Sequence, residues 1–163
     1  MNRLGTSGRQ RIAGVIFLVL LGGVIAGYLA TSGGGKRKPI PWRDVTAQAG
    51  TVRWADPTNS VIRNQEKLDT LYRVATLGPH LQPPTIDFGK RLAVLIAAGP
   101  RSSTGYSLAV ESVTGKGDRI DVVVRERTPS LADHVTPRVT YPFRLITLAK
   151  TSKHVHVRYA GRS

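Results

Sequence analysis

The 163-residue sequence contains no cysteine and few acidic or aromatic side chains. The absence of cysteine excludes disulfide bonds, thiolate metal sites, cysteine nucleophiles and lipid anchors attached through a cysteine. Ten acidic residues stand against 24 Lys and Arg, and the formal charge of +14 indicates an anionic partner. The most basic stretch, residues 138–162, has only three aromatic residues for stacking on bases. We therefore expect no nucleic-acid partner.

Residues 12–30 form the longest apolar run, nineteen consecutive residues without a charge. A helix of this length spans about 28 Å, close to the hydrocarbon thickness of a bilayer. We expect a single transmembrane signal-anchor helix, preceded by a basic cytoplasmic tail at residues 1–11. A cleaved signal peptide is the alternative, because it also combines a basic start with an apolar middle. Gly23 and Gly27 have the small-xxx-small spacing that allows a weak homodimer.

Residues 31–43 have the composition of a flexible basic linker, with three glycines, a basic triplet and two prolines. We expect Lys36, Arg37 and Lys38 to rest on anionic headgroups at the membrane surface. The remaining residues, 44–163, are long enough to bury one ordinary core and are expected to form a single domain.

Period-two alternation of apolar and polar residues dominates this domain and predicts β-strands. The expected strands include residues 92–98, 106–113 and 120–127, followed by a last hairpin of residues 143–149 and 154–159. One helix is expected at residues 65–77, with Asn64 as its N-cap and Leu68 and Tyr72 on its buried face. The predicted fold class is mainly β (α+β), a compact antiparallel sandwich or roll with one packed helix behind a transmembrane helix.

Catalytic and metal-binding constellations are lacking. Asp133 and His134, with Ser102 or Ser103, provide the residue types of a hydrolase triad but no sequence sign of its geometry. His154 and His156 lie on the same face of a strand among cationic neighbours, which disfavour a divalent ion. We expect no enzyme activity, no metal and no cofactor.

One loop stands out between the most apolar strand and the next strand. It carries small hydroxyl residues, a glycine and an aromatic side chain, namely Arg101, Ser102, Ser103, Thr104, Gly105 and Tyr106. Rigid polar loops on β scaffolds are frequent binding elements, so the six residues are candidates for a protein-binding loop. The alternative is an ordinary connection with Tyr106 folded onto the core.

Residues 61–146 resemble the PrcB-type domain, named for an accessory subunit of a bacterial surface protease complex. The resemblance depends on the order and spacing of five short motifs. These are Val61-Ile62-Arg63-Asn64-Gln65-Glu66, Ile86-Asp87-Phe88, Ser103-Thr104-Gly105-Tyr106, Val124-Arg125-Glu126-Arg127-Thr128-Pro129 and Tyr141-Pro142-Phe143. The family has Thr-Gly-Gly-Tyr in the loop, where this chain has a single glycine. The loop is also similar to the Asn-Pro-Thr-Thr-Gly-Tyr loop of chagasin-like cysteine-protease inhibitors.

The PrcB resemblance implies a domain outside the cytoplasm with no catalytic activity. It favours a single-pass protein of the cytoplasmic (inner) membrane whose domain is extracytoplasmic and binds a protein, with a protease as the candidate partner. The loop, together with the connection at residues 128–142, is the expected contact. The alternative function is a basic module that associates with an anionic cell-envelope polymer or with lipid headgroups.

Overall fold

The computed structural model describes residues 36–78 and 81–161, and the chain from Arg37 onward forms one compact unit. The expected transmembrane helix and the Gly23/Gly27 pair lie outside the described residues. Within the described ranges, no helix has both the length and the hydropathy needed to cross a bilayer.

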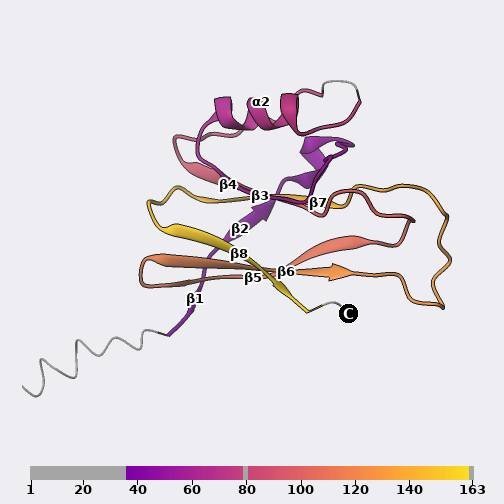
Figure 1. Ribbon diagram of the computed structural model, residues 1–163. Coiled ribbons are helices and arrows are strands. Elements are labelled where there is room, and N and C mark those ends of the chain that lie inside the picture. Colours follow the sequence, from indigo (N-terminus) through magenta and orange to yellow (C-terminus); the bar gives the residue numbers. More distant parts are fainter. Residues whose placement is uncertain (1–35, 79–80, 162–163) are drawn as a thin grey trace, which may run out of the picture. The chain divides into compact units, whose positions relative to one another are not determined.

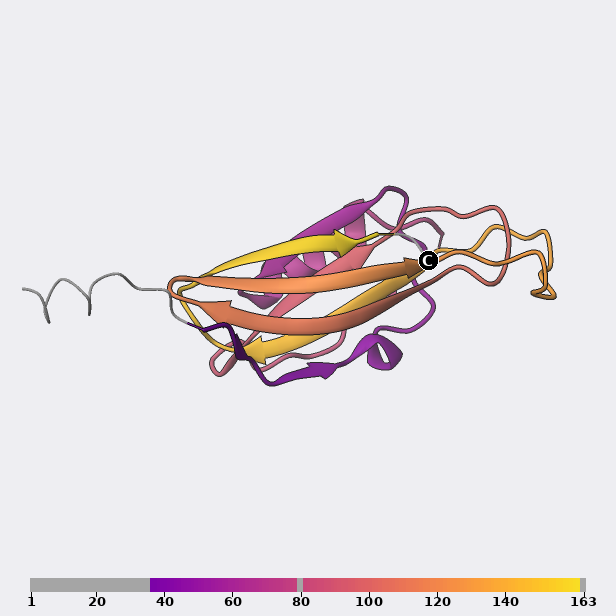
Figure 2. The same ribbon diagram turned by 90° about the horizontal axis from the view of Figure 1, so that it is seen from below.

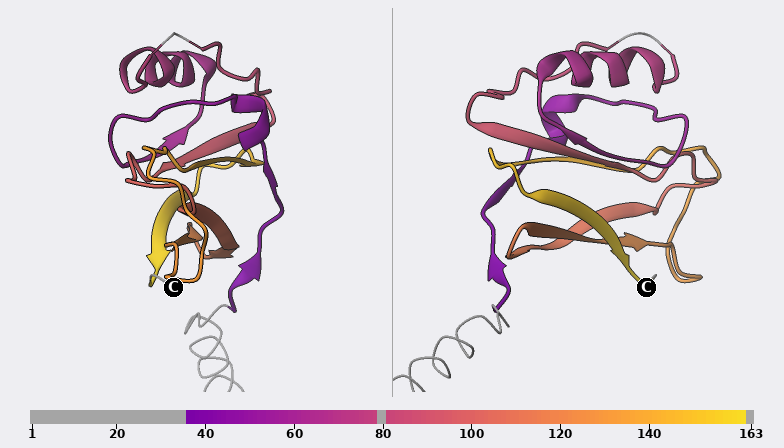
Figure 3. Two further views of the ribbon diagram at one scale, coloured as in Figure 1. Left: turned by 90° about the vertical axis from the view of Figure 1, so that its right-hand side faces the viewer. Right: turned by 60° about the vertical axis from the view of Figure 1, so that its left-hand side comes forward.

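Two four-stranded sheets and one helix make three layers (Figures 1 and 3). The outer sheet has the order β1-β5-β6-β8, with bounds Lys38–Pro39, Ser107–Lys116, Arg119–Arg127 and His154–Ala160. The inner sheet has the order β2-β7-β4-β3, with bounds Trp42–Asp44, Phe143–Ala149, Arg91–Ala97 and Thr58–Ile62. Helix α2 (Gln65–Val74) covers the face of the inner sheet that points away from the outer sheet.

Strand β4 shows why the inner sheet occupies the middle layer. Its unbroken apolar sequence is typical of a strand covered on both faces. Leu92, Val94 and Ile96 pack into the core between the two sheets, whereas Ala93 and Leu95 pack into the core beneath α2. The predicted central strand is therefore confirmed, and alternate residues of one strand supply both cores.

The helix begins as predicted but ends earlier. The Asn64 side chain accepts a hydrogen bond from the backbone N–H of Lys67 at 2.9 Å, which caps the first turn. The helix ends at Val74 rather than at residue 77 because the chain beyond it joins another segment. Thr76 forms an isolated β-bridge with Trp54, and the N–H of Leu77 donates to the carbonyl of Arg53 at 2.7 Å.

The predicted last hairpin is wrong. β7 belongs to the inner sheet and β8 to the outer sheet, where β8 pairs in parallel with β6. The fold is therefore a mixed sandwich and not a purely antiparallel one. Residues 150–153 cross between the layers, and the Arg63 guanidinium stabilises this crossing by donating to the carbonyls of Thr151 and Lys153.

The flexible linker expected at residues 31–43 does not extend to its predicted end. Lys38 and Pro39 form β1, which pairs with the end of β5, and the N–H of Ile40 donates to Val113 at 2.9 Å. Trp42–Asp44 then forms β2 at the edge of the inner sheet, before the 3-10 helix η1 (Thr46–Ala49). These backbone pairs attach the segment to both sheets, so the ordered domain begins near Arg37.

Candidate functional site

The loop after β4 and the long connection after β6 lie side by side beyond one end of the sheets (Figures 2 and 3). We call residues 99–106 and 128–142 together the loop tip. Arg101 and Thr140 exchange backbone hydrogen bonds of 2.8 and 2.9 Å, which makes a one-residue β-bridge between the two loops. Further along, the N–H of Thr104 donates to the carbonyl of Thr136 at 3.0 Å. Two irregular loops therefore support each other through their backbones.

Threonine hydroxyls add two more links across the loop tip. The Thr104 hydroxyl accepts from the N–H of Thr136 at 2.9 Å, and the Thr140 hydroxyl donates to the carbonyl of Ser103 at 2.8 Å. Thr104, one of the small hydroxyl residues that made the shorter loop a candidate in the sequence, thus helps to join that loop to its neighbour through its side chain. Each such bond satisfies backbone groups that a long loop otherwise leaves to water.

Gly105 permits the close approach of the two loops. Its φ of +95° lies in the region that favours glycine. A Cβ at this position would lie 2.9 Å from Val135 Cγ1 and 3.0 Å from Pro129 Cβ. The single glycine of the motif is therefore required both by its backbone conformation and by the space available.

Arg101 points back into the fold rather than out to solvent. Its Nε donates to Glu126 Oε1 at 2.5 Å, and its Nη1 donates to the carbonyl of Ala98 at 2.7 Å. The hydrogen bond to Glu126 is the main cause that raises the pKa of Arg101 above its ordinary value. Glu126, whose side chain is 8% exposed, thereby has its charge paired. Arg101 anchors the base of the shorter loop.

The other predicted contact residues differ in accessibility. Ser102 and Gly105 are exposed, while Ser103, Thr104 and Tyr106 are half-buried. Much of the accessible apolar surface instead comes from the longer loop, where the exposed fractions of Leu131, Val135 and Val139 are 110%, 39% and 55%. The sequence signal for these residues was three aliphatic side chains inside a polar, proline-rich connection.

A groove of about 650 Å³ adjoins the loop tip. Residues 50–53 form one wall and residues 138–141 the other. Within these walls Val52 is buried and apolar, and buried Phe143 adds to the apolar lining. Arg53 and Arg138 contribute exposed cationic side chains. Such a lining suits an extended segment that combines apolar and acidic side chains.

Asp133 organises the far part of the longer loop. Its carboxylate accepts from the N–H of Ser130 at 2.9 Å and from Arg127 Nη2 at 3.1 Å. The backbone hydrogen bond from Ser130 is the largest cause of the lowered pKa of Asp133, and the positive charge of Arg127 adds to it. Asp133, which the sequence offered for a hydrolase triad, thus uses its carboxylate to stabilise the loop.

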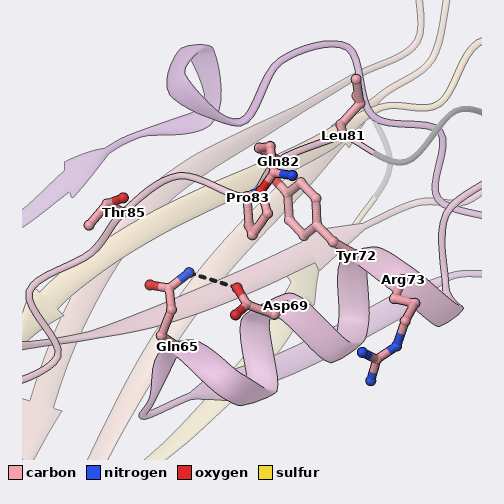
Figure 4. A pocket seen from close by; sticks show the side chains of 8 residues that line it. All are labelled: Gln65, Asp69, Tyr72, Arg73, Leu81, Gln82, Pro83 and Thr85. Carbon is pink, nitrogen blue, oxygen red and sulfur yellow. Dashed lines mark hydrogen bonds between the residues drawn. The ribbon is translucent and has the colours of Figure 1, made fainter.

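A second pocket, of about 470 Å³, lies between α2 and residues 81–85 (Figure 4). Gln65 donates to Asp69 Oδ1 at 2.9 Å along the helix that forms one side of the pocket. Burial raises the pKa of Tyr72 to about 12, so its hydroxyl stays protonated at neutral pH. The pocket presents two amides, one carboxylate and one guanidinium without a nucleophile placed beside a base, an arrangement that indicates no particular reaction.

The remaining predicted residues lie at the other end of the sheets. Lys36, Arg37 and Lys38 are exposed there, with an Arg37 guanidinium nitrogen 4.0 Å from Asp121 Oδ2. His156 Nδ1 lies 3.1 Å from an Arg119 guanidinium nitrogen on the outer face of the outer sheet. Across residues 36–78 and 81–161, no three His, Asp or Glu side chains gather in a group that could hold a metal ion.

Comparison with protein families finds a match for part of the chain. Residues 92–149 match the family model described as PrcB C-terminal. The match runs from β4 to the end of β7 and includes both loops of the loop tip, which confirms the predicted resemblance over these residues. No curated protein and no solved structure matches the chain.

Proposed function

We propose that this protein is a membrane-anchored, extracytoplasmic protein-binding domain that assists or modulates a protease without catalysing a reaction itself. The match of residues 92–149 to the PrcB C-terminal family supports an association with a protease complex. In this proposal residues 12–30 hold the chain in the cytoplasmic membrane, and the loop tip contacts the partner.

The observation that carries the proposal is the construction of the loop tip. Backbone and threonine hydrogen bonds hold two long loops in one arrangement, and that arrangement leaves Leu131 and Val139 in solvent. Apolar side chains on a surface that is already ordered lose little conformational entropy on binding. In a loop that served only as a connection, apolar side chains exposed to solvent would contribute nothing to stability or binding.

The adjoining groove indicates the chemistry of the partner. Its apolar lining accepts aliphatic or aromatic side chains, while Arg53 and Arg138 favour carboxylates. An extended segment with alternating acidic and apolar residues fits this surface. The partner is therefore expected to contact the groove with a strand or loop that carries negative charge.

Quantitative co-purification tests the role of the loop tip. The double variant Leu131→Ser with Val139→Ser removes two exposed apolar side chains, and Val74→Ser is the matched control because Val74 is 69% exposed on α2. Burying one such side chain contributes about 1.5–3 kcal/mol. The amount of a protease subunit that co-purifies from solubilised membranes is therefore expected to fall at least about tenfold in the double variant. Equal recovery with the double variant and with Val74→Ser would contradict the role of the loop tip.

Fractionation tests the location separately. A retained anchor keeps the full-length chain in carbonate-washed membranes, and an extracytoplasmic domain is digested when a protease is added to intact spheroplasts. A shortened chain in the soluble fraction would indicate the cleaved signal peptide instead. A chain that is digested only after the membrane is broken would reverse the proposed orientation.

A further inference from the structure

The lysines of this protein gather at the end of the sheets opposite the loop tip. The sequence has seven lysines, and five of them lie on turns, at a strand end or at the start of the ordered domain. We call these five the lysine face: Lys38, Lys90, Lys116, Lys150 and Lys153. The loop tip, by contrast, contains no lysine.

Backbone contacts show that the lysine face is one continuous surface. The N–H of Lys150 donates to the carbonyl of Lys90 at 2.8 Å, which joins two turns of the inner sheet. In the outer sheet, Lys38 is the register partner of Gly115, directly before Lys116. The N–H of His154 donates to Asp118 at 3.0 Å, so the segment carrying Lys153 lies against the turn between β5 and β6.

The lysine face has more positive than negative charge. Lys38, Lys90, Lys116 and Lys150 are exposed, and Lys153 is half-buried. Two carboxylates form ion pairs on this surface: Asp87 lies 3.5 Å from Lys90 Nζ, and Asp118 lies 3.6 Å from His154 Nε2. Asp121 is nearly buried, and Arg119 Nε donates to its carboxylate at 2.6 Å. The excess of lysine is therefore directed to solvent rather than used within the fold.

We infer that the lysine face binds the anionic headgroups of the membrane in which the chain is anchored, an inference that rests on the proposed membrane anchor. The ordered domain begins at this end, because β1 pairs with the last residues of β5. Only residues 31–36 separate the apolar run from Arg37, and six residues reach at most about 20 Å. Lysines on short turns suit this role, since each is a mobile point charge on a long apolar stem.

This binding mode orients the domain on the membrane. Strand β5 begins at Ser107 beside the loop tip and ends at Lys116 on the lysine face, and Figure 2 shows the two regions at opposite ends of the sheets. Ten strand residues extend about 30 Å. With the lysine face on the headgroups, the loop tip is presented well away from the bilayer, where another protein can reach it.

Site-resolved acylation of the lysines tests the inference on the full chain. The protein is reconstituted in nanodiscs of phosphatidylcholine alone or mixed with phosphatidylglycerol, treated briefly with uncharged acetic anhydride, and analysed by mass spectrometry. The substitution Arg138→Lys keeps the charge of an exposed loop-tip residue and provides a reference amine far from the lysine face. Lys90, Lys116 and Lys150 are expected to react at least about threefold more slowly on anionic nanodiscs, and salt is expected to restore their rates.

The outcomes separate this inference from the proposed function. Slower acylation of the lysine face with an unchanged rate at position 138 supports the inference. Equal rates on both lipids, with the chain in the nanodisc fraction, overturn the inference and leave the membrane anchor intact. A chain that does not enter the nanodisc fraction overturns both. Slowing of all amines alike, position 138 included, also overturns the inference, because it indicates a general surface effect.

Discussion

The loop tip and the lysine face lie at opposite ends of the same sheets and are built on different principles. The loop tip consists of two long segments that depend on each other through bonds such as Arg101–Thr140 and Thr104–Thr136. The lysine face consists mainly of short turns whose geometry follows from the strands they connect, as at Gly117 between β5 and β6. The loop tip therefore has a fixed backbone arrangement, whereas the lysine face is characterised by its positive charge.

This difference indicates which kind of partner each end suits. An ordered apolar surface binds another protein through shape, because its side chains are fixed before contact. A set of mobile lysines binds an anionic surface through net charge, which requires no fixed arrangement. Substitutions at the loop tip should therefore affect stability and binding, whereas replacing the lysines of the lysine face should mainly affect its association with anionic surfaces.

The largest effect on stability is expected from Gly105→Ala. The new Cβ meets Val135 and Pro129 at about 3 Å on a backbone with φ of +95°, so the free energy of unfolding should fall by about 2–4 kcal/mol. The matched control is Gly117→Ala in the turn between β5 and β6, where φ is +57° and nothing lies within 4 Å of the added Cβ. The control should cost about 1–2 kcal/mol, and urea unfolding followed by tryptophan fluorescence compares the two. Equal losses would show that the two loops do not need close contact.

Glu126→Gln should have the next largest effect. The substitution leaves Arg101 without its charge partner at a site where Glu126 is buried, and the expected loss in the free energy of unfolding is about 2 kcal/mol. Glu111→Gln is the control, since Glu111 forms an ion pair with Arg125 at the surface, where solvent screening leaves such a pair little effect on stability. A loss for Glu126→Gln no larger than for Glu111→Gln would argue against Arg101 as the anchor of the shorter loop.

Asp133→Asn should destabilise the protein in a pH-dependent way. The folded protein holds the pKa of Asp133 below its ordinary value of 3.8, so the carboxylate contributes stability above that pH. The contribution decreases as the pH falls through the lowered pKa. The difference in free energy of unfolding between wild type and Asp133→Asn should therefore be largest near neutral pH and shrink toward acid pH, as measured by urea unfolding across a pH series. A difference that grows on acidification would have the wrong sign for this account.

The smallest effect on stability is expected from replacing Lys90, Lys116, Lys150 and Lys153 together by Gln. These side chains are mostly solvated, so the free energy of unfolding should change by less than about 1 kcal/mol in total. The same variant should lose its preference for anionic nanodiscs over neutral ones. A large fall in the free energy of unfolding, measured in the same way, would show that the lysines stabilise the fold. It would contradict the difference proposed between the two ends.

The sequence predicts much of the fold because strands and helices leave local signals. The apolar run of β4, the alternation of β6 and the Asn64 cap were all readable and correctly placed. The partner of β8 was not readable. A four-residue connection between two apolar strands is typical of a hairpin, and the contact that stabilises the crossing comes from Arg63, far away in the sequence.

The sequence marks the loop that we propose as a binding element, but it does not show how the side chains of that loop are arranged. Glycine and hydroxyl residues marked the loop that contains Arg101, but residue types alone do not show which side chains point inward. Arg101 anchors the loop because Glu126 lies on an adjoining strand, a relation that only the folded chain establishes. The exposure of Leu131 likewise follows from the pairing of the two loops and not from any local pattern.

The most direct test of the account places the same photo-crosslinking amino acid at each end of the full chain in native membranes. Substituted for Leu131, the probe lies on the loop tip, and substituted for Lys116, it lies on the lysine face. We predict a discrete protein adduct from position 131 and a lipid adduct from position 116. A lipid adduct from position 131, or the same protein adduct from both positions, would contradict the assignment of the two ends to different partners.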